Sequence, residues 1–243
     1  MFKVIVNGFI DLVYPKRCLL CAARIDELLF ENFLCRGCFA KIEKNKAPFC
    51  AKCGQSLTHT QFENGVCNKC RRKPFAFSRA WSACYYEGVL KDLIHRFKYE
   101  HNPKLARLLA QPLAGFIQEY KIPLEKFDCC IPMPLHPIRL REREFNQAQL
   151  LAEEIGGNFN LQILRGALSK IKNTRPQTDL KEKERFSNIK GAFAVQDETM
   201  IKGKTILLLD DLITTGATAS EASATLINAG AKDVCVLTLA TPR

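Results

Sequence analysis

Short apolar runs alternate along the C-terminal two thirds of the chain with stretches whose apolar residues recur every three or four positions. Amphipathic helices are predicted at residues 88–99, 104–120 and 145–155, the last stopped by Gly156 and Gly157. Buried strands are predicted at residues 81–86, 127–134, 206–209 and 234–240. Residues 204–230 are the clearest strand–loop–helix unit, with Gly230 as the predicted C-cap. Apolar strands without alternation, separated by helices, predict an α/β domain whose parallel sheet is covered on both faces.

The N-terminal part has a different pattern, because eight of the twelve cysteines lie in four CxxC pairs. The pairs are Cys18/Cys21, Cys35/Cys38, Cys50/Cys53 and Cys67/Cys70. Thirteen residues separate the first pair from the second and the third from the fourth, so the block is an internal repeat with an offset of 32 residues. Two CxxC loops supply the four thiolates of a tetrahedral site that has no open position, which predicts two structural Zn²⁺ ions. An iron–sulfur cluster or a redox dithiol is the alternative, and sequential pairing within each half is the default.

A domain boundary is predicted after the last CxxC pair, which gives a double zinc ribbon at residues 1–75 and an α/β domain at residues 76–243. A structural zinc site contributes on the order of 10 kcal/mol or more, so metal removal is expected to unfold residues 1–75 and to spare the rest. No apolar run approaches the ~18–20 residues that cross a bilayer. The first residues lack an uninterrupted apolar stretch and a small-residue cleavage site. We therefore expect a cytoplasmic protein without a transmembrane segment, in which clustered cysteines bind metal.

The formal net charge of +11 points to acidic partners. Two Zn(Cys)₄ centres each carry −2, so the metal-bound chain is nearer to about +7. Basic residues surround the cysteine pairs: Lys41, Lys44, Lys46, Lys52, Lys69, Arg71, Arg72 and Lys73. They suit a phosphate backbone, and an ordinary solvated surface is the alternative. Four phenylalanines in the same region could stack on bases or could form a small ribbon core: Phe49, Phe62, Phe75 and Phe77.

Candidate chemistry is concentrated in residues 206–218, where four apolar residues precede Asp210 and Asp211, and a Thr-Thr-Gly-Ala-Thr loop follows. Ligands of open α/β sheets bind at the carboxyl ends of the strands. The loop enters a helix N-terminus, where free N–H groups and the helix dipole favour an anion, and Gly216 permits close approach of a phosphate. A ligand with a phosphate at one end and a diol at the other fits, as in ribose 5-phosphate. Simple capping roles for these residues are the alternative.

Residues 206–218 resemble the phosphoribosyl-pyrophosphate (PRPP) signature of the type I phosphoribosyltransferases at every position. Together with the cysteine-rich N-terminus and the segments 131–152 and 174–193, they give a layout similar to that of the ComF family over essentially the whole chain. The resemblance implies a phosphoribosyltransferase-like parallel sheet flanked by helices and preceded by a small Cys₄ double zinc ribbon. It also implies a role in handling single-stranded DNA during natural transformation or DNA utilisation, with DNA-uptake or competence machinery as a partner.

By this resemblance, Asp210 and Asp211 hold the ribose hydroxyls and residues 214–218 cradle the 5-phosphate, through Thr214, Thr215, Gly216, Ala217 and Thr218. Met133 and Pro134 occupy the pyrophosphate-loop position, and Arg139, Arg143, Asn146 and Gln147 lie in an R-G-F-N-Q-like segment. Mg²⁺ would bind mainly through PRPP oxygens and ribose hydroxyls. Glu144 replaces the usual glycine of that segment. An inward-facing carboxylate there would repel pyrophosphate, and an outward-facing one would not.

Residues 165–190 match the flexible catalytic loop of the fold and lack strong periodicity. Lys170, Lys172 and Arg175 could close over a leaving pyrophosphate, or they could hold a DNA backbone. No residue in the chain is recognisable as a nucleobase reader. The leading hypothesis is therefore a DNA-handling protein with a PRPP-type site, and the alternative is an active Mg²⁺-dependent phosphoribosyltransferase with an unidentified acceptor. The cysteines outside the CxxC pairs are expected to be small buried apolar residues: Cys84, Cys129, Cys130 and Cys235.

Overall fold

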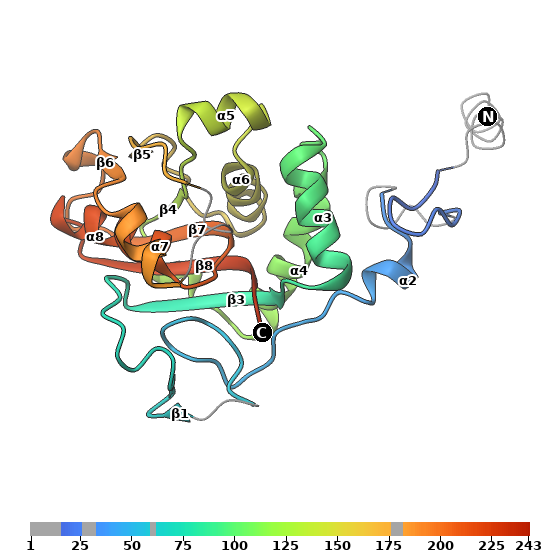
Figure 1. The fold of residues 1–243 in the computed structure, drawn as a ribbon, viewed down its shortest axis with the longest axis horizontal. Helices are drawn as coiled ribbons and strands as arrows, with labels where there is room; N and C mark the ends of the chain where they lie inside the picture. The colour runs from blue at the N-terminus through green and yellow to red at the C-terminus, as the bar shows by residue number, and fades with distance from the viewer. Residues whose placement is uncertain (1–15, 26–32, 59–61, 176–181) are drawn as a thin grey trace.

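The computed structural model describes residues 16–25, 33–58, 62–175 and 182–243, so the N-terminal segment on which the signal-peptide prediction rests lies outside it. At the centre is a four-stranded parallel sheet with the strand order β3-β8-β7-β4 (Figure 1). Its strands are β3 (Arg79–Tyr85), β4 (Cys129–Pro132), β7 (Thr205–Leu212) and β8 (Asp233–Thr241). The parallel sheet predicted from four apolar runs is confirmed.

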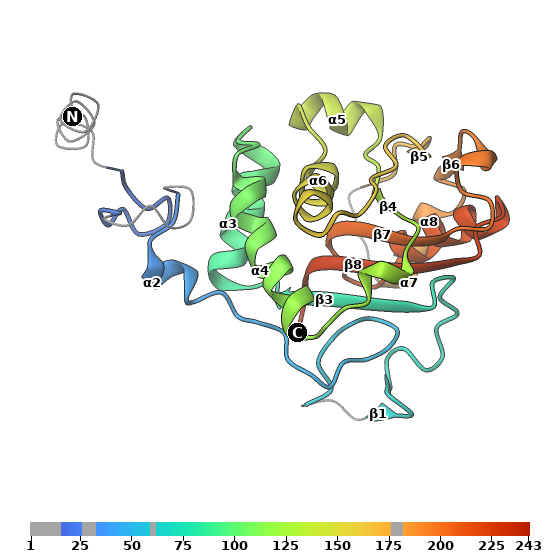
Figure 2. The same cartoon turned by 180° about the vertical axis from the view of Figure 1, so that it is seen from behind.

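Helices cover both faces of this sheet (Figures 1 and 2). One face carries α3 (Gly88–Tyr99), α4 (Leu105–Glu119) and α6 (Gln147–Phe159). The other carries α8 (Ala217–Asn228), with α7 (Glu182–Ile189) packed beside it. Strand residues alternate between the two sides: Leu207 and Leu209 belong to one buried cluster, and Ile206 and Leu208 belong to the other. Because both sides of each strand are covered, the strands contain no polar alternation.

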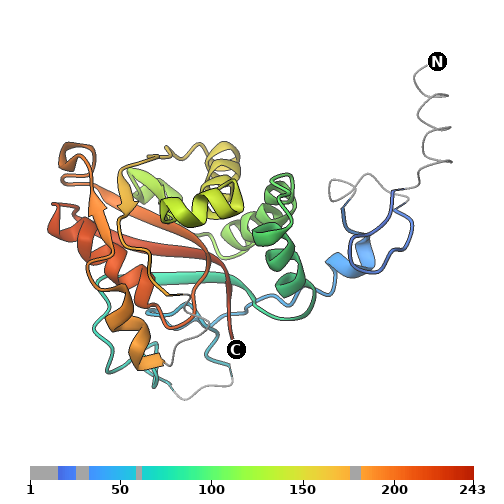
Figure 3. The same cartoon turned by 45° about the horizontal axis from the view of Figure 1, so that its top comes forward.

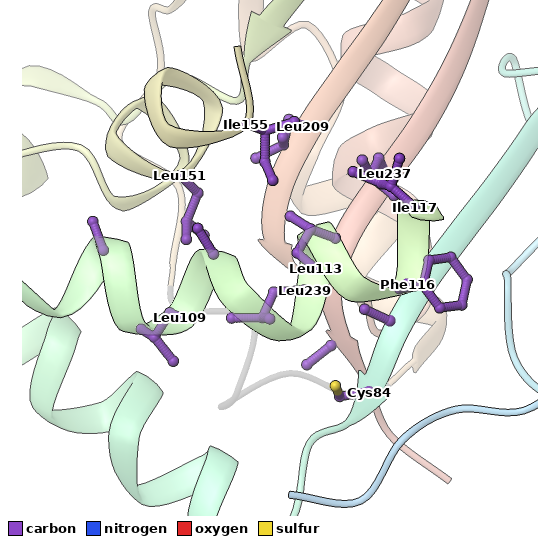
Figure 4. Packing of buried hydrophobic residues seen from close by; sticks show 14 of the residues in the cluster. Cys84, Leu109, Leu113, Phe116, Ile117, Leu151, Ile155, Leu209, Leu237 and Leu239 are labelled. Carbon is purple, nitrogen blue, oxygen red and sulfur yellow. The ribbon is translucent and has the colours of Figure 1, made fainter. Parts of the chain in front are cut away.

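Figure 4 shows the cluster between α4 and the sheet. Leu113 of α4 lies in the same cluster as Leu209 of β7 and Leu237 of β8, and all three side chains have 0% exposure. Burial of a leucine side chain is worth roughly 1.5–3 kcal/mol. This packed layer fixes the positions of β7 and β8, and therefore the positions of the residues at their carboxyl ends. The four cysteines outside the CxxC pairs are all buried, as predicted: Cys84, Cys129, Cys130 and Cys235.

Smaller elements complete the described structure. Two short antiparallel sheets pair β1 (Phe62–Glu63) with β2 (Val66–Cys67), and β5 (Leu168–Lys170) with β6 (Phe193–Val195). The remaining helical segments are α2 (Arg36–Phe39), α5 (Pro137–Arg143), η2 (Leu124–Lys126) and η4 (Glu198–Met200). Residues 165–190, which match the flexible catalytic loop of the fold and lack strong periodicity, contain both β5 and α7. Of the described residues, none lies in a helix long and apolar enough to cross a bilayer.

Two predicted helix ends differ from the structure. The helix predicted to stop at Gly156 continues to Phe159, and Asn160 caps it in the left-handed conformation at φ +52°. A Cβ on Gly156 would lie 2.8 Å from the side chain of Ile163, so this glycine allows close packing and does not end the helix. Helix α8 has Ala229 at its C-cap, and Gly230, the predicted cap, follows one position later at φ +95°.

The second cysteine repeat packs along the edge strand β3, whereas the first lies beyond α3 (Figures 1 and 3). Asn45, only 1% exposed, makes the principal link. Its Nδ2 donates to the carbonyls of Gly54 (2.7 Å) and Ser82 (2.8 Å), and its Oδ1 accepts from the N–H of Ser56 (2.9 Å). A buried amide with three hydrogen bonds fixes the second repeat to the sheet, because each lost bond would leave a buried group unsatisfied.

Candidate functional site

Eight thiols form two groups in which all sulfur atoms lie within 4.8 Å of one another. The first group is Cys18, Cys21, Cys35 and Cys38, and the second is Cys50, Cys53, Cys67 and Cys70. Across the pairs, the Sγ atoms of Cys21 and Cys35 are 3.6 Å apart and those of Cys53 and Cys67 are 3.9 Å apart. Tetrahedral Zn–S bonds of about 2.3 Å place sulfurs about 3.8 Å apart. The two groups therefore fit two Cys₄ zinc sites with sequential pairing, as predicted.

A pair of carboxylates ends strand β7, and the pleat sends them to opposite faces of the sheet. Asp210 follows Leu208 toward the α8 side, where it lines a small cavity. Asp211 follows Leu209 toward the other face, where its Oδ2 forms an ion pair with Nζ of Lys98 from α3. Both side chains of this ion pair are largely buried, with 16% exposure for Lys98 and 11% for Asp211.

Charge and burial shift the protonation equilibria of these groups. Burial, and then the neighbouring charge of Asp211, raise the pKa of Asp210 to about 8, although Lys98 opposes the shift. Burial by itself would lower the pKa of Lys98, but its ion pair with Asp211 outweighs this effect and the net shift is upward. The N–H of Asp211 donates to Oδ1 of Asp210 at 2.8 Å, which fixes the orientation of that carboxyl group. Near neutral pH, Lys98 is charged and Asp210 holds a proton for much of the time.

The loop of residues 214–218 joins the end of β7 to the start of α8. Gly216 is the N-cap of α8 at φ +79°, a left-handed conformation that favours glycine. The Oγ1 of Thr215 accepts a hydrogen bond from the N–H of Ala217 at 3.4 Å. A cavity, here called the loop cavity, lies between this loop and the sheet and is lined by Asp210, Thr214, Gly216, Thr218 and Thr238, among others. The first N–H groups of α8 thus border the same cavity as the Asp210 carboxyl group.

The segment after β4 reaches the same edge of the sheet. The N–H of Met133 donates to the carbonyl of Leu209 at 2.8 Å, which ties the predicted pyrophosphate loop to β7. Asn146 holds this loop from the other side, since its Nδ2 donates to the carbonyl of Met133 at 3.0 Å while its Oδ1 caps α6. Met133 is buried and Pro134 is half-buried. The structure therefore brings these two predicted residues next to the end of β7.

Several predicted cations lie around the carboxylates and affect one another's protonation. Burial lowers the pKa of Lys170, Asp210 opposes this shift, and the charges of Arg139 and Arg143 add to it. The guanidinium of Arg143 lies 5.5 Å from the centre of the Tyr99 ring and donates to Oε1 of Gln147 at 3.1 Å. Arg139 forms an ion pair with Glu142 at 2.7 Å. With Lys98, four cations from α3, α5 and β5 surround the end of β7.

Two further predicted residues make hydrogen bonds away from the end of β7, Lys172 through its side chain and Arg175 through its backbone carbonyl. The Nζ of Lys172 donates to the carbonyl of Lys190 at 2.9 Å, and the carbonyl of Arg175 accepts from Asn188 at 3.1 Å. Neither contact involves the carboxylates of β7. Instead, Arg185 of α7 reaches the loop, and its Nη1 donates to Oγ1 of Thr214 at 3.3 Å.

Glu144 faces outward, which settles one question that the sequence left open. Its side chain is 67% exposed, and its Oε2 lies 3.3 Å from Nδ1 of His101. The residue is the C-cap of α5 at φ +66°, a left-handed conformation. A glycine at this position of the family pattern has a simple physical reason, because only glycine adopts that backbone without strain.

Phe75 connects the second zinc site to the loop. Its ring contacts the buried group formed around Cys50, Cys67 and Cys70, and it also packs against the α8 side of the sheet. A Cβ on Gly216 would lie 2.7 Å from Cε1 of Phe75. Of the four phenylalanines considered as base-stacking residues, only Phe62 is strongly exposed, at 52%. Phe77 is buried, and Phe49 packs on Phe116 and Tyr120. Both therefore have the packing role that was the alternative to base stacking.

Lys98, Arg185 and the structural role of Phe75 were not predicted from the sequence. Lys98 had a detectable signal, because it follows Leu90 and Ile94 at four-residue steps and so lies on the buried face of α3. A lysine on an apolar helix face is rarely buried without a partner. Arg185 and Phe75 carry no such periodic signal, and only tertiary contacts reveal them.

Comparison with protein families first defines the class. The family model described as "Double zinc ribbon domain" matches residues 9–71, and the one described as "Phosphoribosyl transferase domain" matches residues 149–243. The parallel sheet, the β7–α8 loop and the two Cys₄ groups agree with these matches. The molecule is thus a double zinc ribbon followed by a type I phosphoribosyltransferase-like α/β fold.

Whole-chain comparison then identifies the family. "Competence protein F" of Haemophilus influenzae is 30% identical over 227 residues, covering 92% of this chain and 96% of the relative. "DNA utilization protein YhgH" of Escherichia coli K12 is 28% identical, covering 93% and 96%. "Competence protein ComFC" of Bacillus subtilis is 27% identical, covering 88% and 89%. The chain belongs to the competence protein F, or ComF, family.

Proposed function

We propose that this protein handles incoming single-stranded DNA in natural transformation or DNA utilisation, and that the end of β7 binds PRPP or a related phosphoribosyl ligand. The names of its relatives support the first part, since they refer to competence and to DNA utilisation. The formal net charge of +11 also suits a phosphate backbone. In this role the competence or DNA-uptake machinery is the expected partner.

The observation that carries the second part is the arrangement around Asp210. This carboxyl group lines the loop cavity together with Thr214, Gly216 and Thr218 at the start of α8. A 5-phosphate on the loop would accept hydrogen bonds from the free N–H groups of the helix and from the threonine hydroxyls. Asp210 would then accept from a ribose hydroxyl. Asp211 faces Lys98 instead, so its role would be to hold that cation in place.

Four cations around the end of β7 would bind the pyrophosphate part of the ligand. Lys98, Arg139, Arg143 and Lys170 would neutralise a pyrophosphate group on C1 of the ribose. Mg²⁺ would bind mainly to ligand oxygens and keep several waters. The same cations would stabilise pyrophosphate as it leaves, which favours a Mg²⁺-dependent phosphoribosyltransferase as the second candidate function.

Isothermal titration with Mg²⁺-PRPP tests the site. Asp210→Asn should reduce the affinity by at least about tenfold, a loss of ~1.4 kcal/mol, because an NH₂ donor replaces one carboxyl oxygen that would accept from a ribose hydroxyl. Asp128→Asn is the matched control, with the same change of charge at the opposite end of the sheet, where Asp128 precedes β4. Equal affinities in both variants would contradict the assignment of Asp210. The double variant with Asp211→Asn should abolish binding.

Two further assays separate the functions. Single-stranded oligonucleotide should bind at moderate salt, with an affinity that falls as salt rises. The absence of binding, or binding without salt dependence, would contradict the DNA-handling role. If PRPP binds, a screen of nucleobases and nucleotides for pyrophosphate release tests the enzymatic alternative, and turnover with any acceptor would establish it.

A further inference from the structure

A second cavity, here called the ribbon cavity, adjoins the 214–218 loop and has a volume of about 210 Å³. Its walls come from the second zinc ribbon, the loop itself, α7 and the last residues of β8 and beyond. Thr214 lines both cavities, whereas Asp210 and Thr218 line only the loop cavity. The two cavities are therefore neighbours separated by the loop.

The walls of the ribbon cavity are chemically suited to a phosphate. Lys69 and Lys73 come from the ribbon, Arg185 comes from α7, and the hydroxyls of Thr214 and Thr215 add uncharged donors. None of the described residues that line the cavity is acidic. Cysteines of the second zinc site also line it, and part of the positive charge balances the net −2 of a Zn(Cys)₄ centre. Ammonium and guanidinium groups with nearby hydroxyls are the usual ligands of phosphate oxygens.

The position of the cavity restricts the kind of ligand. A free phosphoribosyl ligand ends at its 5-phosphate, so nothing of it would extend past the 214–218 loop. A nucleic-acid strand differs, because each internal 5′-phosphate is also esterified to the 3′-oxygen of the adjacent sugar. The strand must therefore continue beyond a phosphate that lies on the loop. The Nη1 of Arg185 already bonds Oγ1 of Thr214 at 3.3 Å, at the border between the two cavities. The geometry suits a phosphodiester that passes over the loop.

The ribbon is held firmly enough to form part of a site. The N–H of Ala76 donates to Oγ of Ser220 in α8 at 3.1 Å, and the ring of Phe75 packs against Gly216. On the other side, Nε2 of Gln55 donates to the carbonyl of Pro242 at 3.2 Å. These contacts fix Lys69 and Lys73 relative to the loop, and such preorganisation lowers the entropic cost of binding.

We propose that the ribbon cavity binds a phosphate of single-stranded DNA, next along the strand to a phosphate that lies on the 214–218 loop. The inference rests on the proposed function, since it takes DNA handling as given, and it adds the path of the strand. PRPP and DNA then share the loop, so they compete for it. The second zinc ribbon serves as one wall of a nucleic-acid site.

The test uses the full-length, zinc-loaded protein and a 3′-fluorescein oligothymidylate of about 20 nucleotides, with fluorescence anisotropy measured from about 50 to 300 mM salt. Lys69→Gln/Lys73→Gln removes two cations of the cavity. Lys121→Gln/Lys126→Gln is the matched control, because these exposed lysines carry the same charge and do not line the cavity. Zinc content and thermal melting of each variant confirm that the ribbon is intact.

Each phosphate neutralised on a single strand contributes about 0.7 to the steepness of the salt dependence, so loss of the one phosphate in the cavity should reduce the steepness by about 0.7 and the affinity about fivefold at 0.1 M salt. The control should lose no more than about twofold. Saturating Mg²⁺-PRPP should displace the oligonucleotide from the wild-type protein. Equal losses in the two double variants, or oligonucleotide binding that is unaffected by bound PRPP, would overturn the proposed path. Failure of the wild-type protein to bind the oligonucleotide at all would instead overturn the proposed function, and this inference with it.

Discussion

Gly216 connects the loop to the second zinc ribbon, and Gly216→Ala tests that connection. The residue has φ +79°, and a left-handed conformation costs a residue with a side chain roughly 1–2 kcal/mol. The new methyl group would lie 2.7 Å from Cε1 of Phe75, against an ordinary carbon contact of about 3.5–4.0 Å. Overpacking of this kind costs typically 1–3 kcal/mol. The expected total is a loss of about 2–5 kcal/mol.

Thermal unfolding followed by circular dichroism measures this loss. At about 2–4 °C per kcal/mol for a chain of this size, the melting midpoint should fall by roughly 10 °C. Gly203→Ala is the matched control, since Gly203 has φ +73° and nothing lies within 4 Å of its Cβ position. The control should show the backbone cost alone. The affinity of Gly216→Ala for Mg²⁺-PRPP should also fall at least about tenfold, because the new methyl group forces the 214–218 loop to move. A tenfold loss of affinity corresponds to ~1.4 kcal/mol.

The contact with Phe75 can be isolated by a double-mutant cycle. In a Phe75→Leu background, Gly216→Ala should lose only the backbone cost, about 1–2 kcal/mol, because the shorter side chain leaves room for the methyl group. The reasoning is refuted if Gly216→Ala costs the same in both backgrounds, or if it costs no more than Gly203→Ala.

Three further predictions concern buried polar groups. Lys98→Met leaves the Asp211 carboxylate without its partner and should cost about 3–5 kcal/mol in thermal unfolding; an unchanged midpoint would contradict the ion pair. Asn45→Leu removes three buried side-chain hydrogen bonds and should cost at least about 3 kcal/mol in the same assay, and a loss under about 1 kcal/mol would refute this. Because burial raises the pKa of Asp210 to about 8, the folded chain holds a proton that the unfolded chain loses near pH 4. Stability should therefore fall as pH rises from about 4 to 8, and Asp210→Asn should flatten this part of the profile.

The sheet could be predicted from sequence because both of its faces are buried. The run 206–209 contains no polar position and the run 234–240 contains only one, Thr238, and each lies in a strand of the parallel sheet. The cysteine spacing predicted both zinc sites for a similar reason, since ligand geometry fixes the intervals between thiols. A local sequence pattern is enough to predict a strand or a zinc site when the burial or ligand spacing that determines it involves residues close together in the chain.

Side-chain direction within the site is a feature that the sequence interpretation did not take into account. That interpretation assigned Asp210 and Asp211 to the same diol, although adjacent residues of a strand point to opposite faces. The period of two was available in the sequence, and it would have sent Asp211 away from the loop cavity. The partner on that face, Lys98, lies more than 100 positions earlier in the chain. Only tertiary structure brings them together.

The contrast between Lys170 and Lys172 shows where sequence reasoning could not reach. Both lie in a segment without strong periodicity, and the same two roles were open for both from the sequence: closing over pyrophosphate or holding a DNA backbone. Pairing of β5 with β6 places Lys170 within the electrostatic influence of Asp210, while Lys172 bonds the carbonyl of Lys190. The pairing joins residues 168–170 to residues 193–195, a non-local contact that neither segment specifies alone.

The two zinc sites are similar as coordination centres and differ in what they contact. Residues of the first repeat lie beyond α3, far along the molecule from the 214–218 loop (Figure 3). The second repeat shares Phe75 with the α8 side of the sheet and borders the loop through the ribbon cavity. The boundary placed at residue 75 stays a prediction, yet Phe75 itself packs into both parts. The two copies of the motif thus differ in their contacts: the second forms a wall beside the loop, whereas none of the described residues of the first lines the ribbon cavity.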